Sequence, residues 1–240
     1  MRLLLMILLP GLLLLGSALV LIWLPLPAPF PAALSGGRNL LAAVVSGVLG
    51  LTYLAGLAFF LASSVRRSSR TLDALMRARG LKADGQIGVG REYRGTAGGR
   101  PVVVRFFPAQ WPRSSLLNVT VAAEVNCSAA VGVRKPLLDC GNCPPLDMGE
   151  LAPEDSVVLA EDGEWMRTLM ADESGWRAMN NLLADQDRYG HRELYFQPEQ
   201  LWLRARPTGH VSQDQVGSWL DDLLVLAEAA EGIEGSRPGG

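Results

Sequence analysis

Cysteine, histidine and lysine are the scarce residues of this sequence. Its 240 residues include three cysteines, two histidines and two lysines. Three cysteines are too few, and odd in number, for a framework of disulfides. The two histidines have no serine or cysteine pattern beside them, which argues against a catalytic triad. These scarcities favour a non-enzymatic protein.

Charged residues are missing from two long stretches near the N-terminus. None occurs in residues 3–27 or in residues 40–65. Each stretch has enough apolar residues to cross a hydrocarbon core of about 30 Å. We therefore predict two transmembrane helices, at residues 1–27 and 40–65. A cleaved signal peptide is the alternative for the first stretch, but the apolar core of a signal peptide is usually shorter.

Arginine determines the predicted orientation in the membrane. The stretch 28–39 is rich in proline and glycine and predicts an extracytoplasmic loop, whereas Arg66, Arg67, Arg70 and Arg77 follow the second predicted span. Positive charge next to a span marks its cytoplasmic end. We therefore predict a protein of the bacterial inner membrane with both termini in the cytoplasm. The same arginines are candidate contacts for anionic membrane lipids.

The rest of the chain has the periodicity of a mixed fold. A basic juxtamembrane helix is expected at 66–82, an α+β domain at 83–234 and a disordered tail at 235–240. Strand patterns occur at 86–93, 101–107, 116–125, 129–134, 156–159, 193–197 and 200–206. Helical spacing occurs at 164–184, with a break near Ser174 and Gly175, and again after Ser212. The predicted fold class is α+β: two N-terminal transmembrane helices, then an antiparallel sheet packed with amphipathic helices.

A family resemblance rests on three short motifs. They are Gly80-Leu81 after a basic helix, Tyr93-Arg94-Gly95, and the strand that opens with Gly99-Arg100-Pro101 and continues with three valines. The arrangement resembles a loose group of uncharacterised bacterial membrane-anchored proteins. Members of that group carry an acidic and aromatic stretch before the helices, and residues 148–155 of this chain depart from it. The resemblance implies a domain of unknown function behind transmembrane helices.

The motif Cys140-Gly141-Asn142-Cys143 is the one pattern with recognised chemistry. Two thiolates at this spacing can hold one side of a tetrahedral zinc ion or form a redox pair. Zinc needs further ligands, for which Cys127, His191 and His210 are the soft candidates. The third interpretation is a reduced loop with two incidental cysteines, and we favour it because the ligand set is incomplete.

Charge is divided unevenly along the chain. Residues 66–113 contain 11 basic and 3 acidic side chains, whereas residues 139–240 contain 20 acidic and 7 basic ones. An acidic domain does not favour nucleic acid as a partner. We expect no cofactor, with zinc as the alternative, and a protein partner or a structural role for the domain.

Overall fold

The computed structural model describes residues 69–109, 114–125, 127–133, 140–141, 143–153, 156–185, 190–208 and 211–233, and before them residues 44, 47–48, 50–57, 59, 63 and 67. The chain divides into two units, Met1–Arg66 and Arg67–Gly240. The second unit contains every strand of the described chain. The candidate site must therefore be sought in this second unit.

The prediction of two membrane-spanning helices is corrected by this structure. Within the described residues, no helix is long and apolar enough to cross a membrane. The predicted first span and the loop at 28–39 lie outside the described residues. The predictions of an integral membrane protein and of an inner-membrane location are overturned by the same finding.

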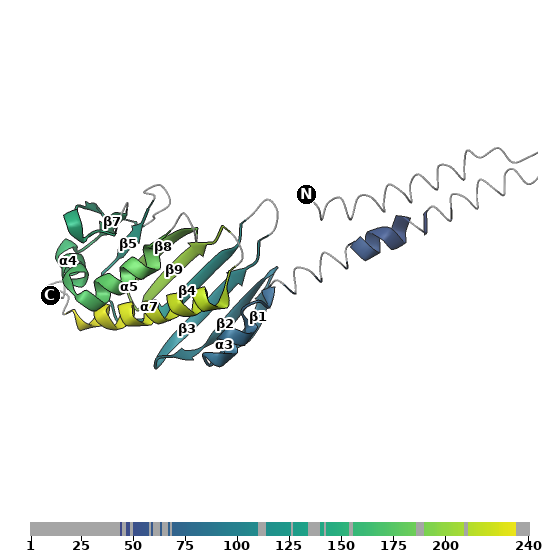
Figure 1. Cartoon of the computed structure of the whole chain (residues 1–240), viewed down its shortest axis with the longest axis horizontal. Helices are drawn as coiled ribbons and strands as arrows, with labels where there is room; N and C mark the ends of the chain where they lie inside the picture. Colours follow the sequence, from purple (N-terminus) through teal and green to yellow (C-terminus); the bar gives the residue numbers. More distant parts are fainter. Residues whose placement is uncertain are drawn as a thin grey trace, which may run out of the picture. The chain divides into compact units, whose positions relative to one another are not determined.

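In the described part of the chain, nine strands form one antiparallel sheet (Figure 1). Their order across the sheet is β1-β2-β3-β4-β9-β8-β5-β7-β6. The strands are β1 (Leu81–Ile87), β2 (Gly90–Ala97), β3 (Arg100–Phe107), β4 (Leu116–Ala122), β5 (Ala129–Gly132), β6 (Pro145–Leu146), β7 (Val157–Ala160), β8 (His191–Gln197) and β9 (Gln200–Arg206). The first four strands follow one another as a meander, and the hairpin of β8 and β9 is inserted between β4 and β5.

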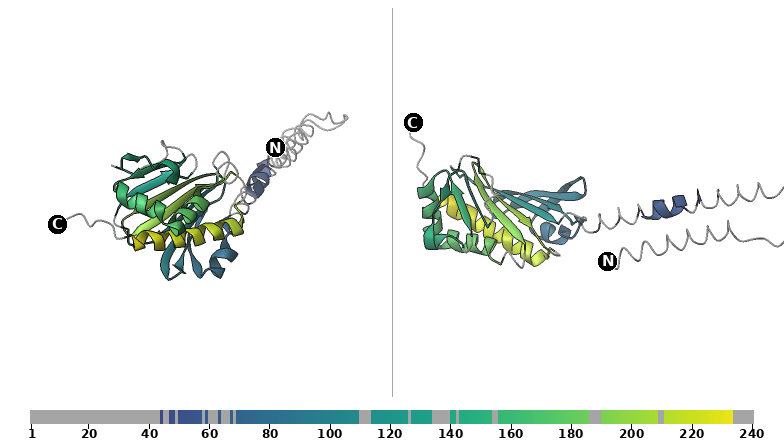
Figure 2. Two further views of the ribbon diagram at one scale, coloured as in Figure 1. Left: turned by 60° about the vertical axis from the view of Figure 1, so that its left-hand side comes forward. Right: turned by 90° about the horizontal axis from the view of Figure 1, so that it is seen from above.

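The longer helices lie together on one face of this sheet (Figure 2). They are α4 (Gly163–Ala171), α5 (Glu173–Leu183) and α7 (Gln213–Gly232), while α3 (Asp73–Ala78) packs beside β1, and η2 (Gly149–Leu151) is a single 3-10 turn. Helix α7 contacts β4 and β9, and α5 contacts α7 and β8. Side-chain hydrogen bonds at the starts of α4, α5 and α7 come from Asp162, Asp172 and Ser212, respectively.

Alternating burial along the strands shows which side chains face the helices. In β9, Leu201, Leu203 and Ala205 are fully buried, whereas Trp202 and Arg204 between them are partly exposed. The helix-facing side chains form one continuous core, in which the rings of Trp165 and Phe196 meet edge to face at 5.5 Å. The opposite side of the sheet, which we call the open face, is covered by no helix of the described residues.

Candidate functional site

A row of charged and polar side chains crosses the open face. Strand register places Glu92 opposite Arg105, Arg105 opposite Asn118, Asn118 opposite Arg204, and Arg204 opposite Glu193. Cross-strand partners point to the same side of a sheet, so these five residues form a line from β2 to β8. We call this line the charged row. A glutamate stands at each end and an arginine beside each glutamate.

The glutamate on β2 is held by two arginines. Arg105 donates to Oε2 of Glu92 at 2.6 Å, and Arg94 donates to the other carboxylate oxygen. The hydrogen bond from Arg105 lowers the pKa of Glu92 below its ordinary value and outweighs the opposing effect of burial. Both arginines keep about half of their side-chain surface exposed. Their guanidinium groups therefore remain accessible to a ligand.

The glutamate on β8 is more deeply enclosed. The side chain of Glu193 has no exposed surface. Its Oε2 accepts a hydrogen bond from the hydroxyl of Tyr195 at 3.1 Å and lies 3.4 Å from Arg204. Its Oε1 lies 3.0 Å from Nε2 of His191. A buried carboxylate needs such partners, because an unpaired buried charge is costly.

Two aromatic rings lie beside this end of the row. Tyr195 and Trp202 are stacked with their centroids 4.2 Å apart. The guanidinium carbon of Arg204 lies 4.9 Å from the centroid of the Trp202 ring, a cation-π distance. The hydrogen bond to Glu193 and this ring contact together position Arg204.

Two polar atoms in the middle of the open face have no hydrogen-bond partner among the described residues. They are Oδ1 of Asn118 and Nε1 of Trp202, and both atoms are buried. One is an acceptor and the other a donor. Asn118 lies on β4 and Trp202 on the neighbouring β9. Buried polar groups are normally satisfied, so a pair left unsatisfied on the same face indicates a place where a ligand can bind.

The cysteine motif also lies on the open face. Cys140 and Cys143 form a disulfide and pack against a small apolar cluster of Ala130, Leu159 and Tyr195. A disulfide leaves no thiolate for a metal ion. No group of three or more histidine, cysteine or acidic residues in the described chain could hold a metal. The zinc alternative, with Cys140 and Cys143 as ligands, is therefore corrected.

The remaining candidate ligands lie apart from this pair. Cys127 is a free cysteine buried in the main core. His191 pairs with Glu193, and His210 lies outside the described residues. Of the arginines predicted to contact lipid, Arg67, Arg70 and Arg77 are exposed, and Arg66 lies outside the described residues.

Cys127 is expected to resist thiol reagents in the folded protein. Burial, followed by the nearby charges of Asp162 and Glu161, raises its pKa to about 12. At pH 7 this leaves about one thiolate in 100,000, and the thiolate is the reactive form. Iodoacetamide at pH 7 should label Cys127 only when denaturant unfolds the domain. Labelling in the native state at the rate of an exposed thiol would contradict the assignment.

The charged row was not predicted from the sequence. Its residues come from positions 92 to 204 and meet only through the pairing of β4 with β9. A local signal was present, because Glu193 and Tyr195, like Trp202 and Arg204, are two residues apart and so share one face of a strand.

Comparison of the chain with protein-family models, curated proteins and solved structures finds no match. The function is therefore argued from the open face itself.

Proposed function

We propose that the unit Arg67–Gly240 is a protein-binding domain, and that its open face receives an extended acidic segment of a partner protein. The observation that carries this proposal is the unsatisfied pair of Asn118 Oδ1 and Trp202 Nε1. Asn118 stands between Arg105 and Arg204 in the register, and Trp202 lies two residues before Arg204 on β9. A peptide group supplies one N–H donor and one C=O acceptor, which is the complement of this pair.

The side chain of Arg204 affects access to Trp202. Arg204 lies over the ring of Trp202 and keeps 31% of its side-chain surface exposed. When its guanidinium turns outward to meet a carboxylate of the partner, this contact is released, while the stack of Trp202 on Tyr195 remains. Each unsatisfied buried group costs about 1–3 kcal/mol, and hydrogen bonds from the bound segment would recover that free energy.

Charge supports an acidic partner. The charged side chains of the open face on β2, β3, β8 and β9 include four arginines and two glutamates: Arg94, Arg105, Arg204, Arg206, Glu92 and Glu193. Helix α7 on the other face has exposed acidic residues, among them Asp214, Asp221 and Glu228. The domain as a whole is acidic, but the open face has an excess of positive charge. Complementary charge of this kind guides a partner to one face and speeds association.

A matched pair of peptides tests the proposal with the full 240-residue protein. The probes are an acetylated, amidated peptide of alternating alanine and glutamate, and the same peptide with glutamine in place of glutamate. Titration followed by amide chemical shifts should show binding of the glutamate peptide at β4 and β9. Arg105→Gln and Arg204→Gln should each weaken binding about tenfold, since a charge-assisted hydrogen bond contributes about 1.5–3 kcal/mol.

Arg177→Gln is the control variant. Arg177 is an exposed arginine on α5, paired with Glu173 on the helical side of the sheet, and its loss should leave binding unchanged. Equal binding of the glutamine peptide would overturn the proposal, and so would an equal effect of Arg177→Gln. Tighter binding of a single-stranded oligonucleotide to the same face would identify a different class of partner and would also overturn it.

A further inference from the structure

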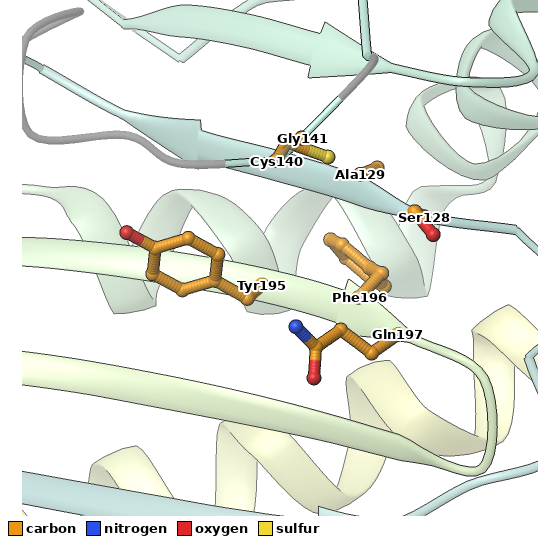
Figure 3. Close-up of a pocket in the computed structure, with 7 residues that line it drawn as sticks. All are labelled: Ser128, Ala129, Cys140, Gly141, Tyr195, Phe196 and Gln197. Atoms are coloured by element: carbon orange, nitrogen blue, oxygen red, sulfur yellow. The ribbon is translucent and has the colours of Figure 1, made fainter.

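A cavity on the open face gives access to the disulfide. Its volume is about 330 Å³, and its lining includes Ser128, Cys140, Gly141, Tyr195 and Gln197 (Figure 3). None of the described lining residues is charged. The cavity lies at the C-terminal end of β8, and Tyr195, which lines it, also donates a hydrogen bond to Glu193 of the charged row. A neutral group of side-chain size fits such a space, whereas an ion would find no counter-charge there.

The two sulfur atoms of the disulfide have different surroundings. Cys140 lines the cavity, and its side chain is drawn between Gly141 and Ala129 (Figure 3). Cys143 is not among the described residues that line it. Sγ of Cys143 lies 3.3 Å from the carbonyl oxygen of Ser128 and 2.9 Å from that of Cys140. A group entering the cavity therefore meets the sulfur of Cys140 first.

We propose that the cavity is a thiol-disulfide exchange site at which an external thiol attacks Cys140. The thiolate of the incoming molecule forms a bond to Sγ of Cys140, and the bond between Cys140 and Cys143 breaks. The electron pair of the broken bond stays on Sγ of Cys143, which takes a proton from water. The products are a mixed disulfide on Cys140 and a thiol on Cys143, so atoms and electrons balance without any other reactant.

The surroundings of Cys143 can hold the thiol that forms after the bond has broken and Sγ has taken up a proton. A thiol S–H can donate a hydrogen bond to a carbonyl oxygen, and two such oxygens are already within reach. Access therefore distinguishes the two sulfurs: Cys140 faces the cavity, and Cys143 packs against the two carbonyl oxygens. We expect the mixed disulfide on Cys140, because the rate of exchange depends on which sulfur the incoming thiol can reach.

Two further observations favour exchange over a purely structural bond. The disulfide joins residues three apart in sequence, and a loop this short restricts the unfolded chain less than a long loop does. The third cysteine does not compete, because Cys127 is buried in the main core with a raised pKa. Exchange chemistry is thereby confined to the cysteine that faces the cavity.

Mass mapping of the opened disulfide tests the proposal on the full-length protein. Reduced glutathione first opens the bond, excess iodoacetamide then alkylates every free thiol, and peptide mapping locates each modification. We expect glutathione on Cys140 and alkylation on Cys143, in excess over the reverse pattern by about tenfold, because the cavity gives the incoming thiol access to Cys140. Glutathione mainly on Cys143, an equal mixture, or no adduct at all would overturn the proposal.

Single variants provide a second, independent measurement. With oxidised glutathione, Cys143→Ser should form its mixed disulfide about tenfold faster than Cys140→Ser, because the remaining thiol of Cys143→Ser faces the cavity. Equal rates would contradict the proposed asymmetry. Cys127→Ala is the control and should leave the mapping unchanged. A folded protein with one surface cysteine, used in place of glutathione, distinguishes the source of the thiol. An adduct with both probes supports exchange with protein thiols, and an adduct with glutathione alone supports exchange with small thiols.

Discussion

Replacement of Gly190 by alanine is expected to lower the free energy of unfolding by about 3 kcal/mol or more. Gly190 precedes β8 and has φ of +87°, a backbone conformation that side chains other than hydrogen disfavour. A Cβ atom there would lie 2.3 Å from the carbonyl oxygen of Arg206 and 2.8 Å from Cα of Pro207. Both atoms belong to the backbone, so relief requires β8 and β9 to move apart where His191 pairs with Arg206.

Gly99→Ala is the matched control for this variant. Gly99 lies in the turn between β2 and β3 with φ of +78°, close to that of Gly190, but a Cβ atom there would meet nothing within 4 Å. The control therefore keeps the conformational cost, about 1 kcal/mol, without the steric clash. Urea unfolding of both variants, followed by circular dichroism, measures the difference. If Gly190→Ala and Gly99→Ala lose the same free energy of unfolding, steric contact between a Cβ atom at position 190 and the backbone of Arg206 and Pro207 does not add to the cost.

The sheet was only partly predictable from the sequence because its edge lacks a pattern. Strand β1 is exposed at every residue after Leu81, so it shows no alternation of apolar and polar residues. The prediction therefore ended a helix at residue 82 and placed one strand at 86–93. In the structure, Gly88 and Val89 form the turn of a hairpin between β1 and β2. The pairing of β4 with β9 lay beyond prediction as well, since 78 residues separate Ala122 from Gln200.

The helical region shows how a capping residue decides a boundary. The sequence predicts a break near Ser174 and Gly175, where a small residue interrupts the apolar spacing. The structure ends α4 at Ala171 and starts α5 at Glu173, with Asp172 between them. The carboxylate of Asp172 accepts hydrogen bonds from the backbone N–H of Gly175 and from the hydroxyl of Ser174. The residues predicted to break the helix are thus the first turn of the second helix.

The candidate site depends on tertiary structure to a greater degree than the fold does. The cysteine motif was recognised from its spacing, but the favoured interpretation, a reduced loop with two incidental cysteines, was wrong, because the two cysteines form a disulfide. The structure pairs the two sulfurs and brings them beside Tyr195, which is distant in the sequence. The charged row needs five strands in correct register, and a shift of one residue in any strand would turn its member toward the helices.

The two glutamates of the charged row are expected to differ strongly in their contribution to stability. Glu193→Ala removes a carboxylate with no exposed surface, which leaves the hydroxyl of Tyr195 and the guanidinium of Arg204 without this partner. Loss of one member of a buried polar cluster typically costs about 3 kcal/mol. Glu92→Ala should cost about 1 kcal/mol or less, because Arg94 and Arg105 are half exposed and water can replace the carboxylate.

Urea unfolding is measured for the two alanine variants and for Glu193→Gln. The comparison separates the effect of side-chain volume at position 193 from the effect of its negative charge. Glutamine preserves the volume and can accept the hydrogen bond from Tyr195, so Glu193→Gln should recover part of the loss seen with alanine. The ion pair with Arg204 is not recovered. Without the ion pair to Glu193, Arg204 is less firmly positioned, so Glu193→Gln should also change the affinity of the open face for the glutamate peptide. The control is Leu220→Ala, a variant in the core. It should lower stability without changing this affinity. If Glu92→Ala and Glu193→Ala lower the free energy of unfolding equally, the depth of burial of each glutamate and its partners does not determine how much it contributes to stability.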